Sequence, residues 1–154
     1  MLFPKVPRLK KFDYKGPYAY FITICTNFKN QYFVEKETVE AVLSLLKGCA
    51  SDYRFKIFAY CFMPDHLHIL LQGEEDSSLK EFMRIFKQKT EWCFKKNRQK
   101  ALWQRSYYDH VLRKDEAIEG ISRYILGNPV RKGLVNDFRD YPFSGSMVFD
   151  INKM

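Results

Sequence analysis

The stretch YCFMPDHLHILLQ, residues 60–72, carries two of the chain's three histidines, one residue apart. Apolar residues precede and follow them, and a Pro-Asp pair interrupts the run as a turn signal. Side chains two residues apart on a strand point to the same face, so His66 and His68 are expected side by side. The stretch predicts a tight hairpin of strands over residues 55–64 and 66–72, with two imidazoles on one face.

Before and after this hairpin, apolar residues alternate between the two-residue spacing of strands and the spacing of helices. Apolar residues at helical spacing predict two helices, the second with its cations on the faces away from its apolar stripe. A third helix is expected to end at Gly127, because Pro129 cannot extend it. The remaining expected elements are strands over residues 18–26 and 102–113 and helices over residues 36–52, 79–97 and 115–127.

The order strand, helix, strand, strand, helix, strand predicts an α+β fold, a ferredoxin-like split βαβ sandwich with an antiparallel sheet. An extra C-terminal helix follows and carries a tyrosine. In this arrangement the first and third strands are central and two helices cover one face of the sheet. The other face is open for a ligand, and the extra helix can dock there. No repeat or linker interrupts the sequence, so one domain is expected over residues 1–154.

Composition limits the possible classes of protein. The chain has 154 residues, 46% hydrophobic and 29% charged, as expected of a globular domain. No apolar run approaches the roughly 18 residues of a membrane span, and the start has no signal-peptide pattern. We therefore expect no membrane partner and a cytoplasmic, nucleoid-associated location. The four cysteines form no C-x-x-C pair and are expected to be reduced: Cys25, Cys49, Cys61 and Cys93.

Positive charge is concentrated in one part of the chain. The net charge is +8, and residues 79–105 hold nine basic and two acidic residues. Such a distribution favours binding to a polyanion, of which nucleic acid fits best. A basic face that is merely solvated is the alternative.

Four residues could form a chemical site. Two imidazoles on one strand face can ligate a metal ion, but hydrogen-bonded strand histidines look the same in sequence. Tyr124 and Asn128 are four residues apart, so on a helix a phenol and an amide oxygen can point at the same spot. Each also has an ordinary structural explanation, as a packing tyrosine and a helix-ending asparagine.

Three motifs make the assignment more specific. FMPDHLHIL, LWQRSYYDHVLR and YILGNPVRKGLV, in this order and at this spacing, resemble the REP-associated tyrosine transposases. These are relatives of the single-tyrosine HUH transposases, which move single-stranded DNA. The resemblance covers residues 18–146 and so implies a single HUH transposase-like domain with that core.

The resemblance implies a role for each residue that matches a motif. His66 and His68 match the paired metal ligands, and Asn128 matches the polar residue that completes the metal shell. Tyr124 matches the nucleophile. Glutamine also occurs at the asparagine position in related enzymes, and Lys132 stands where a small residue is common. The implied cofactor is a divalent metal, Mg²⁺ or Mn²⁺.

The implied activity is metal-dependent cleavage and strand transfer at hairpin DNA through a 5′-phosphotyrosine intermediate. A free tyrosine phenol has a pKa near 10 and needs help to act as a nucleophile. Basic side chains would bind phosphates, and aromatic rings could stack on unpaired bases. The candidate DNA-binding residues are Lys80, Arg84, Lys87, Lys95, Arg105, Tyr107 and Tyr108, and Trp103 and Phe28 are further candidates for stacking.

Other functions remain open at this stage. A domesticated relative could bind hairpin DNA or RNA without cutting it, and a metallohydrolase could use Asp65 as its base. His110 could contact a phosphate or pair with Asp109. Related transposases act as swapped homodimers or as monomers, and the sequence does not decide between these two states.

Overall fold

The computed structural model describes residues 9–154, and its sheet is built on the predicted hairpin. Strands β2 (Phe55–Met63) and β3 (His66–Gly73) pair antiparallel, with Met63 opposite His66 across a two-residue turn. A register shift at Ile57 and Ala59 marks a bulge in β2. The hairpin prediction is confirmed.

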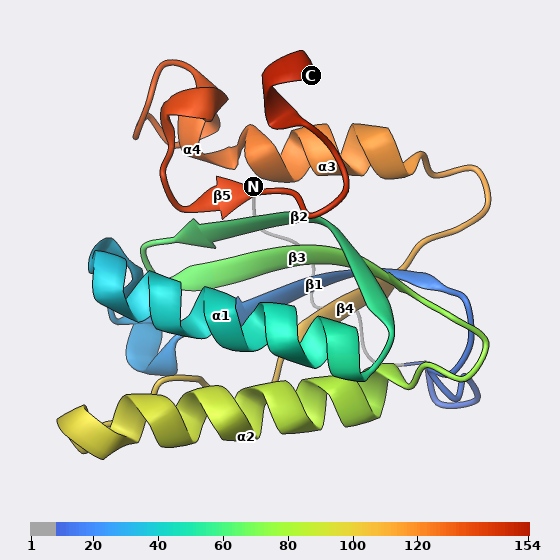
Figure 1. The fold of residues 1–154 in the computed structure, drawn as a ribbon, viewed down its shortest axis with the longest axis horizontal. Helices are drawn as coiled ribbons and strands as arrows, with labels where there is room; N and C mark the ends of the chain where they lie inside the picture. The colour runs from blue at the N-terminus through green and yellow to red at the C-terminus, as the bar shows by residue number, and fades with distance from the viewer. Residues whose placement is uncertain (1–8) are drawn as a thin grey trace.

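Three further strands complete an antiparallel sheet of order β4-β1-β3-β2-β5 (Figure 1). They are β1 (Ala19–Cys25), β4 (Tyr108–Val111) and β5 (Ser144–Gly145). Strands β1 and β3 lie at the centre, as the split βαβ pattern predicts. The histidine pair therefore lies on an inner strand, where both backbone edges are paired.

Two long helices cover one face of the sheet. They are α1 (Lys36–Asp52) and α2 (Leu79–Arg98), which lie side by side in Figure 1. The Ser78 side chain accepts a hydrogen bond from the Glu81 amide and caps α2. Apolar side chains of both helices pack on β1 and β3, and this main core includes Ile22, Leu46, Ile69 and Phe86.

The C-terminal helices cover the opposite face. Helices α3 (Ile118–Leu126) and α4 (Asn128–Arg131) lie above β2 and β3 in Figure 1. A second cluster forms there around Phe21, Leu70, Ile125 and Leu126. The extra helix thus docks on the face that the split βαβ arrangement leaves open.

The expected stop at Gly127 is confirmed, because α3 ends at Leu126 and Gly127 is its C-cap. Gly127 has helical dihedral angles, φ −78° and ψ −8°, and its carbonyl accepts the Arg131 amide at 3.1 Å. Pro129 stands in the first turn of α4, where its missing N–H has no intrahelical partner to lose. The short helix α4, which begins at Asn128 directly after this stop, was not predicted.

The expected strand over residues 102–113 is too long. Only β4 is extended and paired, whereas Trp103 forms an isolated bridge with Thr26. Residues 104–107 cross between these two pairings. Strand β5, which adds to β2, was not predicted. The short 3₁₀ turns are Asn27–Lys29, Tyr32–Val34, Phe138–Asp140 and Ile151–Lys153.

Two further expectations concern cysteines and membranes. All four cysteines are free, with Cys49 and Cys61 buried and the other two half-buried. Over residues 9–154, no helix has the length and apolar character needed to cross a membrane.

Candidate active site

The two histidines of β3 converge through their ring nitrogens. His66 and His68 lie on one face of the strand, and their Nε2 atoms are 3.1 Å apart. On the neighbouring strand β1, Thr23 is paired with His68 and Cys25 is paired with His66. The two-residue period of strands predicts that both histidines lie on one face. The pairing with β1 determines which side chains surround them.

A separate group holds the far nitrogen of each ring. The His66 Nδ1 lies 2.6 Å from Asp65 Oδ1, and the His68 Nδ1 lies 2.9 Å from Thr23 Oγ1. A carboxylate at Nδ1 favours the tautomer whose Nε2 carries a free lone pair, and a hydroxyl there can accept from the same tautomer. Asp65 is thereby engaged in orienting His66. Thr23 carries no sequence signal and becomes visible only through the register of β1 with β3.

Both imidazoles are held in the neutral form. Burial lowers the pKa of His66, although the carboxylate of Asp65 acts in the opposite direction. Burial lowers the pKa of His68 further, and the neighbouring His66 and the guanidinium of Arg131 add to the effect. The His68 residue is only 5% exposed. Neutral imidazole is the form that binds metal ions.

The pair opens into a cavity of about 630 Å³. Asn128, only 6% exposed, lines the same cavity from the junction of α3 and α4. Two lysines, Lys29 and Lys132, also line it and make it attractive to anions. Other lining residues are Thr23, Cys25, Gln31, Met63, Pro64, Asp65, Gln104, Tyr108 and Leu134.

Tyr124 stands beside this cavity and is not among the residues that line it. The Phe21 ring is a neighbour of both the tyrosine and the histidines, with its centroid 6.5 Å from that of Tyr124 and 5.5 Å from that of His68. The Arg131 guanidinium lies over the Tyr124 ring at 4.0 Å. The structure therefore brings three of the four predicted residues into one cavity and places the fourth next to Phe21, a neighbour of His68.

The donor set is compatible with a divalent ion. Two ligand atoms about 2.1 Å from one octahedral ion are separated by about 3 Å, close to the observed Nε2 separation. Over residues 9–154, no group of three His, Cys, Asp or Glu side chains could hold a metal. A site here would therefore need the amide oxygen of Asn128 or a ligand from the substrate.

Comparison with known proteins identifies the family. The family model described as "Transposase IS200 like" matches residues 16–128. The chain belongs to the IS200-like transposase family. A candidate REP-associated tyrosine transposase of Haemophilus influenzae is 31% identical over 145 residues, which cover 86% of this chain and 81% of that protein. The REP-associated tyrosine transposase of Escherichia coli is 34% identical over 96 residues, 60% of this chain and 55% of that one.

Two solved structures share the fold of this transposase-family chain. A REP-associated tyrosine transposase bound to a REP hairpin superposes with a TM-score of 0.74 at 23% identity, covering 90% of this chain and 82% of the other. A candidate transposase of Deinococcus radiodurans superposes with a TM-score of 0.55 at 20% identity, covering 78% and 95%. Both likenesses confirm the predicted α+β architecture.

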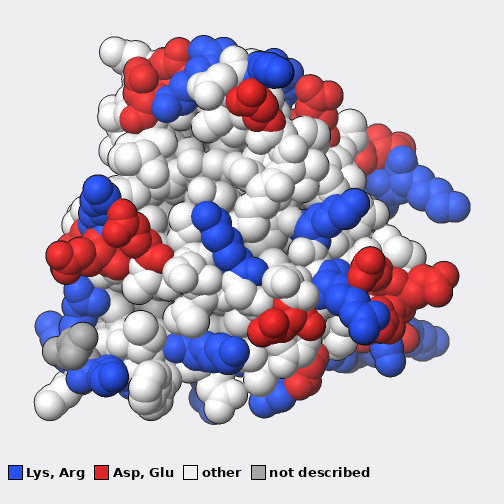
Figure 2. Space-filling view, viewed as in Figure 1, with Lys and Arg blue, Asp and Glu red and all other residues white. Residues whose placement is uncertain are grey.

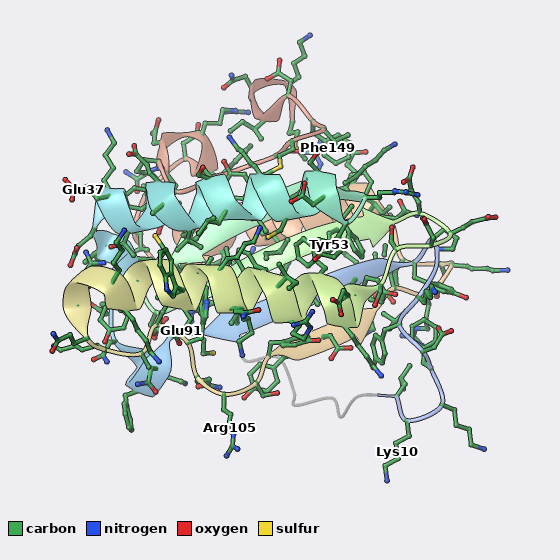
Figure 3. The ribbon with its side chains drawn as sticks, turned by 60° about the horizontal axis from the view of Figure 1, so that its bottom comes forward. Lys10, Glu37, Tyr53, Glu91, Arg105 and Phe149 are labelled. Atoms are coloured by element: carbon green, nitrogen blue, oxygen red, sulfur yellow. The ribbon has the colours of Figure 1, made fainter. Side chains whose placement is uncertain are left out.

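The predicted DNA-binding residues of this family member do not form one surface. Lys80, Arg84, Lys87, Arg105 and Tyr107 line one basic groove of about 460 Å³, together with Met83 and Ser106. Figure 3 shows Arg105 projecting away from the body of the fold. Tyr108 lines the histidine cavity instead, and Lys95 lies farther along α2 and lines neither.

The segment over residues 104–108 separates the basic groove from the histidine cavity. Gln104 and Tyr108 line the cavity, whereas Arg105 and Tyr107 line the groove. Lys87 donates to the Gln104 carbonyl at 3.1 Å, which attaches the segment to α2.

Two other sequence candidates have structural partners. Trp103 is buried and donates its indole N–H to Thr90 at 2.8 Å, so the expectation that it stacks on bases is wrong. His110 does not pair with Asp109; its Nε2 lies 2.9 Å from a carboxylate oxygen of Glu116, just before α3.

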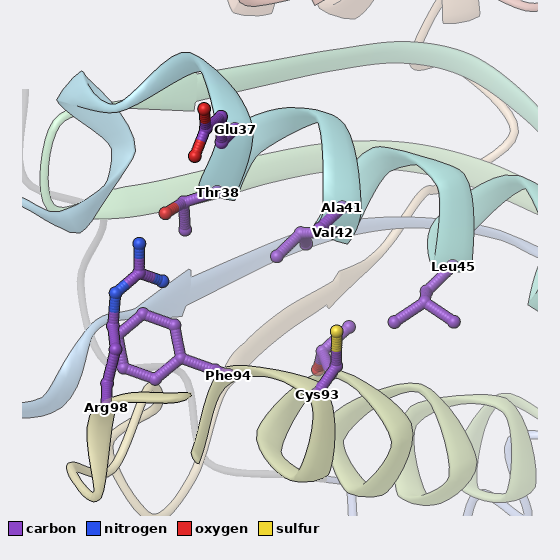
Figure 4. A pocket seen from close by; sticks show the side chains of 9 residues that line it. Glu37, Thr38, Ala41, Val42, Leu45, Cys93, Phe94 and Arg98 are labelled. Atoms are coloured by element: carbon purple, nitrogen blue, oxygen red, sulfur yellow. The ribbon is translucent and has the colours of Figure 1, made fainter. Parts of the chain in front are cut away.

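The face that bears α1 and α2 offers no comparable chemistry. A cavity of about 340 Å³ lies between these helices, and Figure 4 shows Thr38 and Val42 on one wall and Cys93 and Arg98 on the other. It contains no histidine and lies across the sheet from His66. Figure 2 shows cations and anions interspersed over this view of the surface. The candidate site is therefore on the α3 face.

Proposed function

We propose that this protein is a metal-dependent single-stranded DNA endonuclease and strand transferase that acts at hairpin DNA through a 5′-phosphotyrosine intermediate. One observation carries the proposal: the Nε2 atoms of His66 and His68 converge 3.1 Å apart in a cavity shared with Asn128. Membership of a transposase family and the adjacent Tyr124 support the same assignment.

The cofactor in this proposal is Mg²⁺ or Mn²⁺. His66, His68 and Asn128 would hold the ion, which when bound would neutralise charge on a non-bridging oxygen of the scissile phosphate. Two nitrogen ligands and one oxygen suit Mn²⁺ better than Mg²⁺, which prefers oxygen. Asp65 and Thr23 would keep the two rings in orientation.

Tyr124 would supply the nucleophile. Its phenolic oxygen forms a bond to phosphorus, the bond from phosphorus to the 3′ oxygen breaks, and the proton lost by the phenol is balanced by one gained at the departing 3′-hydroxyl. The 5′ end is then joined to the protein as a phosphodiester. Because one ester replaces another, a second 3′-hydroxyl can reverse the step and join two strands.

The remaining side chains would position the DNA. Lys29 and Lys132 line the cavity and would contact phosphates next to the cleaved one. The basic groove would bind the strand beyond residues 104–108. A solved relative is bound to a REP hairpin, which supports a hairpin as the substrate of this chain also.

All the proposed residues come from one chain. The apolar side of α3 packs on its own sheet through Ile125 and Leu126, so Tyr124 and His68 lie near one another without a partner subunit. We therefore propose that the monomer can act alone. A homodimer that exchanges α3 would have to remove these two side chains from their cluster.

One observation favours a second function, hairpin binding without cleavage. Tyr124 does not line the cavity, and its ring packs beside Phe21. Cleavage requires the phenol to reach the phosphate, whereas binding needs only the lysines and the groove. A domesticated binder would still bind the hairpin but would not cleave it.

A gel assay separates the two functions. End-labelled DNA hairpins with an unpaired extension are incubated with the protein in Mn²⁺ or in EDTA and resolved under denaturing conditions. Cleavage should give a metal-dependent protein–DNA adduct that is absent from Tyr124→Phe and present in Tyr53→Phe, a control tyrosine at the end of α1. Binding without an adduct would favour the second function. An adduct that persists in Tyr124→Phe would contradict the assigned nucleophile.

A further inference from the structure

The loop after β1 presents an aromatic ring to solvent. Phe28 is 89% exposed, the largest exposed fraction among the large apolar side chains of residues 9–154. Its backbone is left-handed, with φ 53° and ψ 22°, and Lys29 also has φ 53°. Side chains with a Cβ rarely adopt this conformation, and two in succession are costly to maintain. The fold holds an apolar ring outward in a strained turn.

Buried hydrogen bonds hold this turn in place. Thr26 is fully buried, and its hydroxyl lies 2.7 Å from the Asn30 carbonyl and 3.0 Å from the Asp65 carbonyl. The Thr26 amide also donates to Asp65, and the Asn27 amide donates to the Leu102 carbonyl at 2.8 Å. The loop is therefore anchored at both sides.

The same anchor reaches the histidine pair. Asp65, whose carbonyl holds Thr26, uses its carboxylate to hold the His66 ring. Phe28 is thus linked to His66 through three residues, Asn27, Thr26 and Asp65. The backbone that bears the ring is therefore held in a fixed place relative to the histidine pair.

The neighbours of the ring indicate its ligand. Lys29 follows Phe28 and lines the histidine cavity, where Lys132 adds a second positive charge. Asn27 and Asn30, on either side, are polar. A lone aromatic ring between polar residues, beside a cationic cavity, matches the combination of stacking surface and phosphate contact used for single-stranded nucleic acid. An apolar protein partner would require a wider apolar patch.

We propose that Phe28 is a stacking platform for an unpaired base of the DNA strand whose phosphate lies in the histidine cavity. This inference rests on the proposed function and specifies its substrate as a strand unpaired next to that phosphate. Because every base has a flat π-face, the platform would accept any of them. Lys29 would hold the adjoining phosphate.

Binding by the full-length protein in EDTA tests the platform. The probes are a fluorescent hairpin with an unpaired four-base extension and the same hairpin with a blunt end. Phe28→Ala should weaken binding of the extended hairpin by about 5- to 150-fold, the range for loss of one stacked base. Binding of the blunt hairpin should change less than twofold. Phe28→Trp should retain affinity for both.

A matched control uses the second exposed aromatic residue. Trp92 on α2 is 68% exposed and lies outside the histidine cavity, so Trp92→Ala should leave binding of the extended hairpin unchanged. A 2-aminopurine base in the extension should change fluorescence on binding to the wild type and much less with Phe28→Ala. Thermal unfolding checks that both variants remain folded.

Several outcomes would overturn the inference. Equal binding of the extended hairpin by wild type and Phe28→Ala would do so, as would equal losses for extended and blunt hairpins. If the wild type binds no DNA, the platform and the proposed function are both wrong. If the wild type shows the Phe28-dependent preference but forms no Tyr124 adduct, the platform stands and the proposed cleavage fails.

Discussion

The Nε2 atoms of His66 and His68 lie 3.1 Å apart while Thr23 and Asp65 hold the opposite ring nitrogens. Residues that orient metal ligands commonly contribute 10- to 100-fold to metal affinity. Thr23→Val, which keeps the side-chain shape and removes the hydroxyl, should therefore weaken Mn²⁺ binding by about that factor. Titration calorimetry measures it.

Thr38 provides the control for this prediction. It is a buried threonine on α1, across the sheet, so Thr38→Val should leave Mn²⁺ affinity unchanged. Unaltered affinity in Thr23→Val would show that its hydroxyl does not orient His68.

Two variants of Asn128 should show whether its side chain is an oxygen ligand of the ion or a structural residue. Asn128→Ala removes the only amide expected to complete the ion's shell, so Mn²⁺ affinity and DNA cleavage should both fall by at least about tenfold. Asn128→Asp keeps an oxygen at the same reach and should retain metal binding. Calorimetry and the adduct assay measure the two effects, and equal loss in both variants would argue against ligation.

Acid should destabilise the metal-free protein. The folded pKa of His68 is held well below its usual value by burial, whereas the unfolded value is near 6.5. The unfolded state thus binds the extra proton first, and the free energy of unfolding should decrease as pH falls below about 6.5, by up to about 1.4 kcal/mol per unit for each such histidine.

Urea unfolding in EDTA at pH 7.5, 6.5 and 5.5 measures this dependence. His68→Gln should show a smaller loss between pH 7.5 and 5.5, because one titrating group is gone. A free energy of unfolding that stays constant for the wild type over this range would contradict the buried neutral state.

The sequence predicts those parts of the fold that depend on local periodicity. The strand period places His66 and His68 on one face, and the helical stripe defines α1 over residues 36–52 without error. The segment over residues 102–113 shows the limit. Its pattern is uniform, but Trp103 pairs with Thr26 before the chain leaves the sheet and returns as β4. That break depends on tertiary contacts.

The site was less predictable than the fold. Spacing of four residues suggests that Tyr124 and Asn128 share a target, but of the two only Asn128 lines the cavity, and the Tyr124 ring lies near Phe21. Thr23 could be found only from strand register. No glycine at Phe28 predicts the left-handed turn from the sequence. The hydrogen bonds of Thr26 hold the turn in this conformation instead.

The basic groove should contribute through phosphate charge. Lys87→Ala and Arg105→Ala should each weaken binding to single-stranded DNA and reduce the slope of log affinity against log salt by about 0.7, the value for one phosphate contact. Lys36→Ala provides the control, because Lys36 lies on α1 and faces Glu40. Fluorescence anisotropy at several salt concentrations measures the slopes, and identical slopes in all variants would place the DNA elsewhere.

The hydrogen bond between His110 and Glu116 should position the tyrosine helix. Glu116 also accepts the Arg113 amide at 2.8 Å, so its carboxylate connects β4 to the turn that begins α3. Glu116→Ala would release the start of α3 and displace Tyr124 relative to the cavity. Because catalysis is sensitive to displacements of about 1 Å, the rate of adduct formation should fall by about tenfold or more.

Binding should distinguish this positioning role from direct contact with substrate. DNA and Mn²⁺ affinities of Glu116→Ala should match the wild type, since neither Glu116 nor His110 lines the cavity. Glu119→Ala, which removes an exposed ion pair with Arg123 on the same helix, should leave the rate unchanged. His110→Asn should lower the rate like Glu116→Ala, and the double variant should be no slower than either alone, because both break one connection. Additive losses would mean that the two residues act separately.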